Sequence, residues 1–247
     1  MNNNNRVLDF YIEGIHEGKI PKHIYKFYKI NKNLENCLKE KYLWCSSPNS
    51  FNDPFDTMYN KNSHVHKDQI IGSDDIWVKQ EFSEIFNSFA KNQRISCFSD
   101  LNSIETKEIL MWSHYGDNHK GLCLKFDLLN MLEYWNDNYP WIFFHKVIYE
   151  INFPEIPIEY MGNGKVEATV DFLRTKSLDW KYEQEYRVFH SENKLPYPKD
   201  SLIETRFGCL TTKNDIKKIK KISDSHLRFI KANKSITSFK LEYEEID

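Results

Sequence analysis

The sequence predicts an α+β fold, with one domain built on a bent or split mixed β-sheet that helices flank. Short segments rich in aromatic and β-branched residues lie between turn signals, which is typical of strands. Other segments space their apolar residues as helices do, and no repeat or linker interrupts the 247 residues. We therefore expect a single domain over residues 1–247, with a motif-bearing core at about 23–190 and C-terminal helices and a last strand at 203–247.

The predicted strands follow the aromatic and β-branched segments of the chain. The strands expected to share the main sheet are Tyr25–Ile30, Tyr42–Ser46, Ile95–Ser99, Leu122–Asp127, Lys146–Glu150 and Glu185–Phe189. Two more strands are expected near the C-terminus, at Ile203–Leu210 and at Ser238–Tyr243, where polar and apolar residues alternate.

The predicted helices follow the segments in which apolar residues recur at helical spacing. They are residues 6–20, Asn31–Lys41, Ile76–Lys91, Ser103–Tyr115, Leu128–Trp135, Val166–Lys176, Asn214–Lys221 and Leu227–Ala232. Gly18 and Gly116 favour the C-terminal ends of two of them.

Composition and charge exclude several classes of protein. The net charge of -2 provides no global basic field for nucleic acid, although a local basic patch lies at Lys213–Lys221. The five cysteines are odd in number and show no Cys-x-x-Cys spacing, so we expect reduced thiols in a cytoplasm. His64 and His66 lack further ligands nearby, so no metal site is expected. The sequence shows no signal peptide and no long apolar run, so we expect a cytoplasmic protein without a membrane partner.

The most unusual stretch is residues 177–189, which carries Glu183, Glu185 and Arg187 at alternating positions. On a strand these three side chains would share one face, with Tyr182, Tyr186 and Val188 on the other, core-facing side. Two neighbouring carboxylates repel unless they are solvated or matched by cations, and Arg187 and Lys181 are the nearest candidates for that role. The alternative is an exposed strand face with an ordinary Glu–Arg pair.

Two further clusters combine polar and aromatic residues. The loop at residues 47–56 is dense in turn formers, and Asn52 and Asp53 are suited to bonding nearby backbone amides. It is either a well-made loop whose Phe51 and Phe55 plug the core, or a loop that contacts substrate. The segment at residues 111–116 places His114 among aromatic residues, where it is either a hydrogen-bonded core residue or part of a site.

Three motifs together resemble a bacterial family known only as a domain of unknown function. They occur in order over roughly residues 25–190, and the resemblance implies no activity. The motifs are Tyr42-Leu-Trp-Cys-Ser-Ser-Pro-Asn-Ser-Phe-Asn-Asp-Pro-Phe-Asp56, Met111-Trp-Ser-His-Tyr-Gly116 with Lys120-Gly121, and Trp180-Lys-Tyr-Glu-Gln-Glu-Tyr-Arg187.

The order of an early strand, a strand ending in serines and a late Glu-x-Glu also resembles ADP-ribosyltransferase folds. In that family an early strand residue and a central Ser or Tyr hold NAD, and a late Glu stabilises the ribosyl cation. The resemblance implies that Glu185 is the catalytic carboxylate and Glu183 its substrate-activating neighbour. Lys26 takes the early position, where the family usually has Arg or His. The remaining residues expected to contact NAD are Tyr28, Ser46, Ser47, Asn52, Asp53, His114 and Tyr115.

Three functions therefore remain open at this level. The first is an NAD-consuming ADP-ribosyltransferase or glycohydrolase that acts on an unknown protein or nucleic-acid acceptor, as a toxin or effector in bacterial conflict or phage defence. The second is a sensor that binds a ligand or a protein without catalysis. The third is a nucleic-acid enzyme that uses His114 or His119 with Lys120. No Gly-x-Gly-x-x-Gly supports a Rossmann-type nucleotide site.

Overall fold

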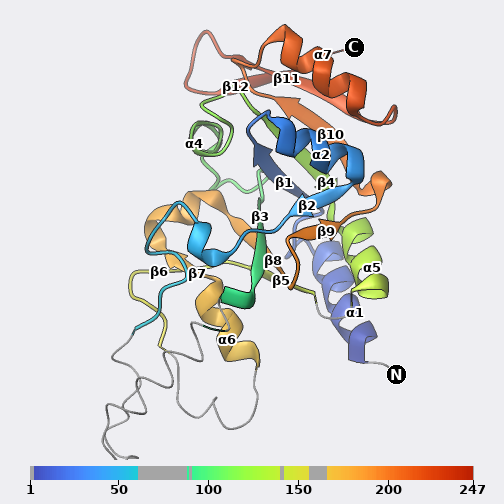
Figure 1. Cartoon of the computed structure of the whole chain (residues 1–247). Helices are drawn as coiled ribbons and strands as arrows, with labels where there is room; N and C mark the ends of the chain where they lie inside the picture. Colours follow the sequence, from blue (N-terminus) through green and yellow to red (C-terminus); the bar gives the residue numbers. More distant parts are fainter. Residues whose placement is uncertain (1–2, 61–87, 89–90, 140–141, 156–165, 247) are drawn as a thin grey trace, which may run out of the picture.

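The computed structural model describes residues 3–60, 88, 91–139, 142–155 and 166–246. Within them the chain forms an eight-stranded mixed sheet, two small two-stranded sheets and flanking helices, which confirms the α+β class (Figure 1). The loop with His64 and His66 lies outside the described residues, as does most of the helix predicted at Ile76–Lys91. No helix in the described part of the chain is long and apolar enough to cross a membrane.

The main sheet has the strand order β12-β11-β10-β4-β1-β3-β8-β5. Neighbouring strands run antiparallel except for β10 and β11, which are parallel. The bounds are β1 His23–Tyr28, β3 Arg94–Ser99, β4 Leu122–Asp127, β5 Phe143–Lys146, β8 Glu185–His190, β10 Leu202–Phe207, β11 Arg228–Lys234 and β12 Leu241–Glu245.

The two predicted strands that differ most from the structure both involve the small sheets. Strand β2 (Tyr42–Trp44) leaves the main sheet and pairs with β9 (Lys194–Pro196). The segment predicted as one strand at Lys146–Glu150 is divided, because Val147 donates its backbone N–H to Glu185 and the chain then turns away. Its second half, β6 (Ile148–Glu150), pairs in parallel with β7 (Thr175–Ser177).

Helices cover the sheet, and their bounds differ from the predictions mainly at the ends. They are α1 Asn3–His16, α2 Lys32–Glu40, α4 Glu108–His114, α5 Leu128–Asn138, α6 Val166–Leu173 and α7 Lys213–Ile222. Asn31 and Asp127 begin α2 and α5 by accepting hydrogen bonds from backbone amides in the first turn. The helix predicted at Val166–Lys176 stops at Leu173 because the next residues pair with β6.

The C-terminal region contains one error of element type. The segment predicted as a helix at Leu227–Ala232 forms strand β11, because it runs parallel to β10 and buries alternate residues, Ile230 and Ala232. The last strand begins at Leu241 rather than Ser238. A short apolar run without flanking signals does not distinguish a buried strand from a helix, and here the tertiary pairing decides.

The main sheet is nearly divided between β1 and β3. Strands β1 and β4 pair along their whole length, whereas β1 and β3 pair only through Tyr25 and Ser99. Farther along, the Lys26 ammonium bridges the gap by donating to the Cys97 carbonyl at 2.9 Å. Figure 1 shows the labels of β1, β4 and β10 in one half of the molecule and those of β3, β8 and β5 in the other. This opening places polar side chains from both halves around one cleft.

Candidate functional site

A buried cluster of five charged side chains lies on strand β8 and the segments packed against it. The carboxylates are Asp56, Glu183 and Glu185, and the cations are Lys176 and Arg187. Each of the five residues exposes 8% or less of its surface. Buried charges of this density require partners, because each loses its hydration on folding.

Arg187 holds one side of the cluster together. Its Nε donates to Glu185 Oε1 at 2.8 Å, and its Nη2 donates to Asp56 Oδ2 at 2.7 Å. Its Nη1 donates to the Leu173 carbonyl, and the guanidinium lies over the Phe51 ring with its carbon 5.2 Å from the ring centre. The fork of an arginine can bind two carboxylates at once, so Arg187 fixes the 47–56 loop to β8.

Lys176 lies between all three carboxylates. Its ammonium donates to Glu183 Oε2 at 2.5 Å and to Glu185 Oε2 at 3.1 Å, and lies 3.8 Å from Asp56 Oδ2. It also lies 4.9 Å from the centre of the Trp180 ring. The lysine therefore occupies the place where a cation would bridge the carboxylates. Among the described residues, no three or more His, Cys, Asp or Glu side chains are grouped so that they could hold a metal ion.

The local backbone explains why both glutamates reach Lys176. Glu183 ends a 3-10 helix, η3 (Leu178–Glu183), and Gln184 takes a left-handed conformation before β8 begins at Glu185. The expectation that Glu183, Glu185 and Arg187 share one strand face is therefore wrong for Glu183. The expectation that Tyr182 faces the core from the same strand is wrong too, because Tyr182 lies in η3 and stays partly exposed. The expectation that Lys181 matches the carboxylates is also wrong, since Lys181 pairs with Glu105 at the surface.

The two glutamates differ in their protonation behaviour. Burial and repulsion by Glu185 raise the pKa of Glu183 to about 7, although Lys176 and Tyr115 partly oppose this. Burial would also raise the pKa of Glu185, but the charges of Arg187 and Lys176 outweigh it and lower that pKa below its usual range. Near neutral pH, Glu185 is thus a fixed anion, and Glu183 is poised to exchange a proton.

A cleft opens beside this cluster at the gap between β1 and β3. Its empty volume is about 560 Å³, part of which is open to solvent. Glu183, Glu185, Lys176 and Asp56 line one side, and Lys26 lies on β1 across the gap. The other lining residues are mainly aromatic or small: Tyr25, Phe27, Phe51, Asn52, Cys97, Phe98, Ser99, Met111 and Tyr115.

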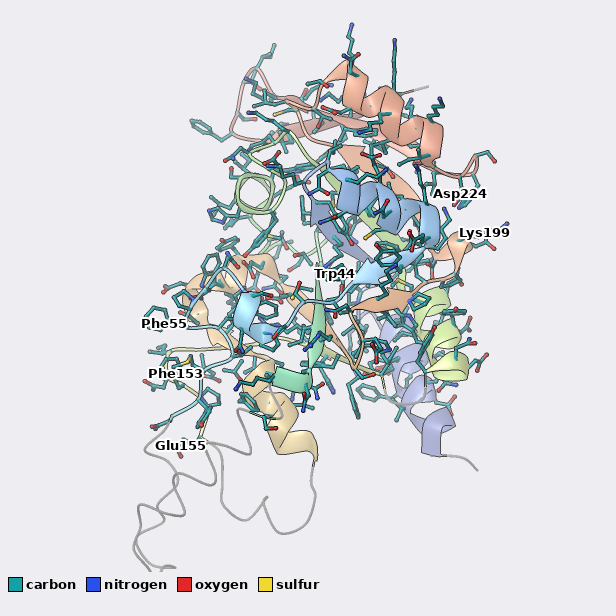
Figure 2. All side chains as sticks on the ribbon, viewed as in Figure 1. Trp44, Phe55, Phe153, Glu155, Lys199 and Asp224 are labelled. Carbon is teal, nitrogen blue, oxygen red and sulfur yellow. The ribbon has the colours of Figure 1, made fainter. Side chains whose placement is uncertain are left out.

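A second, more open groove lies on the outer side of η3 and has an empty volume of about 950 Å³. Trp180, Tyr182 and His114 form its aromatic wall, with Asp53 at its edge. Its apolar residues include Phe55 and Phe153, which come from distant parts of the chain and lie on the same side of the molecule (Figure 2). The cleft and the groove share no lining residue.

The structure brings several of the predicted site residues together. Lys26, Asn52, Tyr115, Glu183 and Glu185 all line the cleft. Tyr115 donates a hydrogen bond to Glu183 Oε1 at 2.5 Å, which joins the end of α4 to the acidic cluster.

Two other predicted site residues line the outer groove instead. Asp53 bonds the backbone amide of Phe55 through its side chain. The Nδ1 atom of His114 lies 2.8 Å from the Tyr182 hydroxyl. Each of the two thus has a local structural partner as well as a place in the groove.

Three predicted residues lie away from the cleft. Tyr28 packs against the main core, and Ser46 pairs through its backbone with Ile95. Ser47 accepts hydrogen bonds from Ser50 at the start of a short 3-10 helix. The serine that lines the cleft is Ser99, which pairs with Glu185 across β3 and β8. Ser46 and Ser47 lie beyond the end of β2, and neither lines the cleft.

Sequence reasoning did not identify Lys176 or Asp56 as members of the site. Lys176 was expected in a helix, and its approach to Glu183 depends on the pairing of β6 and β7, which no local pattern shows. Asp56 could have been found, since it ends the motif that includes Asn52 and Asp53. The spacing of Glu183 and Glu185 is a further signal, because two carboxylates this close require more than one cation nearby if both are buried.

Residues 111–188 match the family model of DUF2971, described as a protein of unknown function. The matched segment runs from α4 into β8 and includes Tyr115, Lys176, Glu183, Glu185 and Arg187. The expected resemblance to a family of unknown function is confirmed over these residues. No curated protein and no solved structure matches the chain. The resemblance to ADP-ribosyltransferases therefore stays a prediction.

Proposed function

We propose that the protein binds NAD in the cleft between β1 and β3 and cleaves its bond to nicotinamide, as ADP-ribosyltransferases and NAD glycohydrolases do. The observation that carries this proposal is the meeting of three functional groups on three adjacent strands. Lys26 on β1, Ser99 on β3 and Glu185 on β8 line one cleft. An early-strand cation, a central hydroxyl and a late carboxylate are the groups that the resemblance requires.

Glu185 is suited to stabilising positive charge. Cleavage of the bond to nicotinamide leaves a ribosyl cation, and a carboxylate already fixed in place lowers its energy without reorganisation. Arg187 and Lys176 keep Glu185 ionised and in one orientation. Lys176 also balances part of the negative charge of Asp56, Glu183 and Glu185, which reduces the repulsion that an anionic dinucleotide would meet in the cleft.

Glu183 is suited to receiving a proton. A carboxyl whose pKa is raised to about 7 is partly ionised at neutral pH, which is the condition for a general base. It lies on the cleft wall beside Glu185, with its two oxygens oriented by Lys176 and Tyr115. In this proposal Glu183 activates the nucleophile that attacks the ribosyl carbon.

The remaining groups of the cleft provide binding. Lys26 places a positive charge at the gap between the strands, where a diphosphate would neutralise it. Phe27 and Phe51 line the cleft with half-buried rings that suit contact with a base. Asn52 is exposed at the rim and has no hydrogen bond through its side chain to another described residue, so its amide is available to a ligand.

The direct test is incubation of the purified protein with NAD, followed by measurement of nicotinamide release. Release that depends on Glu185 is expected. If neither the protein alone nor the protein with cell extract releases nicotinamide, and calorimetry shows no NAD binding, the proposal is wrong.

A second candidate function is ligand binding without catalysis. The observation in its favour is that the charges of Arg187, Lys176 and Glu185 are mutually satisfied, as in a structural ion-pair cluster. Binding of NAD without nicotinamide release would favour this function. The nucleic-acid enzyme is less supported, since His114 bonds Tyr182, and His119 stacks on Trp112 with its Nε2 3.1 Å from Ser113 Oγ.

A further inference from the structure

The position of the two glutamates restricts what can attack a bound substrate. Glu183 exposes 2% of its surface and Glu185 exposes 4%. Glu183 lies beneath two side chains, since Tyr115 bonds one of its oxygens and Lys176 bonds the other. A nucleophile that gives its proton to Glu183 must therefore come within hydrogen-bond reach at the bottom of the cleft.

A wall of side chains separates this base from the outer groove. Tyr115 and Glu183 face the cleft, while their sequence neighbours His114 and Tyr182 face the groove. Within this wall His114 and Tyr182 contact each other. The Nδ1 atom of His114 lies 2.8 Å from the Tyr182 hydroxyl oxygen, which is a hydrogen-bond distance.

The Trp180 ring completes the wall above Lys176. The Lys176 ammonium lines the cleft and lies 4.9 Å from the centre of the Trp180 ring, which lines the groove. A macromolecule seated in the groove would thus meet Trp180 before it met either glutamate. Its side chain or base would have to displace the lysine–tryptophan contact to reach the ribosyl carbon.

The cleft itself has a place for a small hydrogen-bond donor. Asp56 lines the cleft, and its Oδ1 atom is buried without a hydrogen-bond partner among the residues that the structure describes. A buried carboxylate oxygen of this kind accepts a hydrogen bond from whatever donor enters, and water is the smallest donor available.

From this geometry we infer that the acceptor of the reaction is water, so that the protein is an NAD glycohydrolase rather than a transferase that modifies a macromolecule. The inference rests on the proposed function. The bond between the ribosyl carbon and the nicotinamide nitrogen breaks, and nicotinamide leaves with the bonding electron pair. The water oxygen bonds to the ribosyl carbon, and its proton passes to Glu183. The products are ADP-ribose, nicotinamide and one proton.

The test measures both products of NAD cleavage and the fate of the label. Purified protein is incubated with NAD labelled in the adenylate part, in the presence of cell extract. Nicotinamide and free ADP-ribose are expected in equal amounts, with no label on protein or nucleic acid. Label on macromolecules together with a deficit of free ADP-ribose would overturn the inference and leave the proposed function standing. A wild type that releases no nicotinamide would instead overturn both.

A variant of the wall provides a second readout. Trp180→Ala removes the ring above Lys176, and we expect a fraction of the label to move from ADP-ribose to macromolecules while nicotinamide release continues. Trp44→Ala is the matched control, since Trp44, labelled in Figure 2, is an exposed tryptophan on β2. It lines neither the cleft nor the groove. If the product ratio of Trp180→Ala equals that of Trp44→Ala, the ring does not keep macromolecules from Glu183, and the argument from the wall is overturned.

Discussion

Arg187 Nη2 lies 2.7 Å from Asp56 Oδ2, in an ion pair that joins residues 131 positions apart in the sequence. The side chain of Arg187 is fully buried and that of Asp56 almost so. Through this pair the loop that carries Phe51 and Asn52 is held against the strand that carries Glu185. The pair therefore shapes the cleft as well as stabilising the fold.

The first prediction concerns the stability of this ion pair. Arg187→Met should lower the free energy of unfolding by about 3–5 kcal/mol, because Asp56 and Glu185 would lose the cation that compensates them. Arg187→Lys should cost less, since it keeps the charge but cannot bond both carboxylates. Urea denaturation measures both values.

Lys194→Met is the matched control for Arg187. Lys194 pairs with Glu40 at 2.8 Å, but both side chains are more than half exposed. Such a surface pair contributes at most about 1 kcal/mol. If Arg187→Met costs no more than this control, the buried cluster does not hold the loop in place.

The second prediction concerns the pH dependence of stability through Glu183. Folding raises the pKa of Glu183 from 4.5 to about 7. Between these two pH values the folded protein keeps the Glu183 proton, whereas the unfolded chain has released it. The contribution of Glu183 to stability is therefore full below pH 4.5 and is lost as the pH rises to about 7.

Glu183→Gln removes this titration. Denaturation of the wild type from pH 4.5 to 8 should show a decline that the variant lacks, so that the variant becomes relatively more stable as the pH rises. Parallel pH profiles for the two proteins would mean that the pKa of Glu183 is not raised in the folded state.

Much of the fold could be predicted from local patterns, whereas much of the site could not. Strands β1, β3, β4 and β8 follow their aromatic and β-branched segments, because side-chain pattern sets both strand type and buried face. The position of Lys176 depends on a parallel pair of short strands formed with residues 148–150. A contact of that kind leaves no periodic signal in the sequence.

The position of Ser99 next to Glu185 is a second feature that local sequence patterns do not predict. Ser46 and Ser47 stand at the end of a predicted strand and match the order of the resemblance, but β2 ends at Trp44 and neither serine lines the cleft. Ser99 lies on the strand that pairs with β8, and only the register of that pair identifies it. Which serine lies next to Glu185 therefore could not be predicted from the order of residues in the sequence.

The third prediction concerns the binding of NAD by Lys26. Lys26→Ala should raise the KM for NAD about tenfold or more and change kcat little, because a charged hydrogen bond contributes on the order of 1.5–3 kcal/mol. Steady-state kinetics of nicotinamide release separate the two constants.

Lys125→Ala is the matched control for Lys26. Like Lys26, Lys125 lies on a strand of the main sheet, but it does not line the cleft. Its ammonium lies 5.9 Å from the centre of the Tyr25 ring. Equal KM values for the two variants would show that the diphosphate does not lie against Lys26.

The fourth prediction concerns catalysis by Glu185. Glu185→Gln should lower the rate of nicotinamide release about 10²–10³-fold, since it removes the fixed charge opposite the developing cation while keeping the shape of the side chain. The variant should also lose stability, because Lys176 and Arg187 both pair with Glu185. The pKa of Glu185 is lowered on folding, so its stabilising contribution is present above pH 4.5 and is lost as the pH falls below that value.

Arg187→Lys separates the two effects, because it disturbs the same ion pair but keeps the carboxylate. At a temperature where both variants are folded by circular dichroism, Arg187→Lys should retain more of the rate of nicotinamide release than Glu185→Gln. If the two variants lose activity equally while folded, the order of the cluster rather than the charge of Glu185 sets the rate. If Glu185→Gln is as active as the wild type, Glu185 is not the catalytic carboxylate, and Glu183 becomes the residue to test in that role.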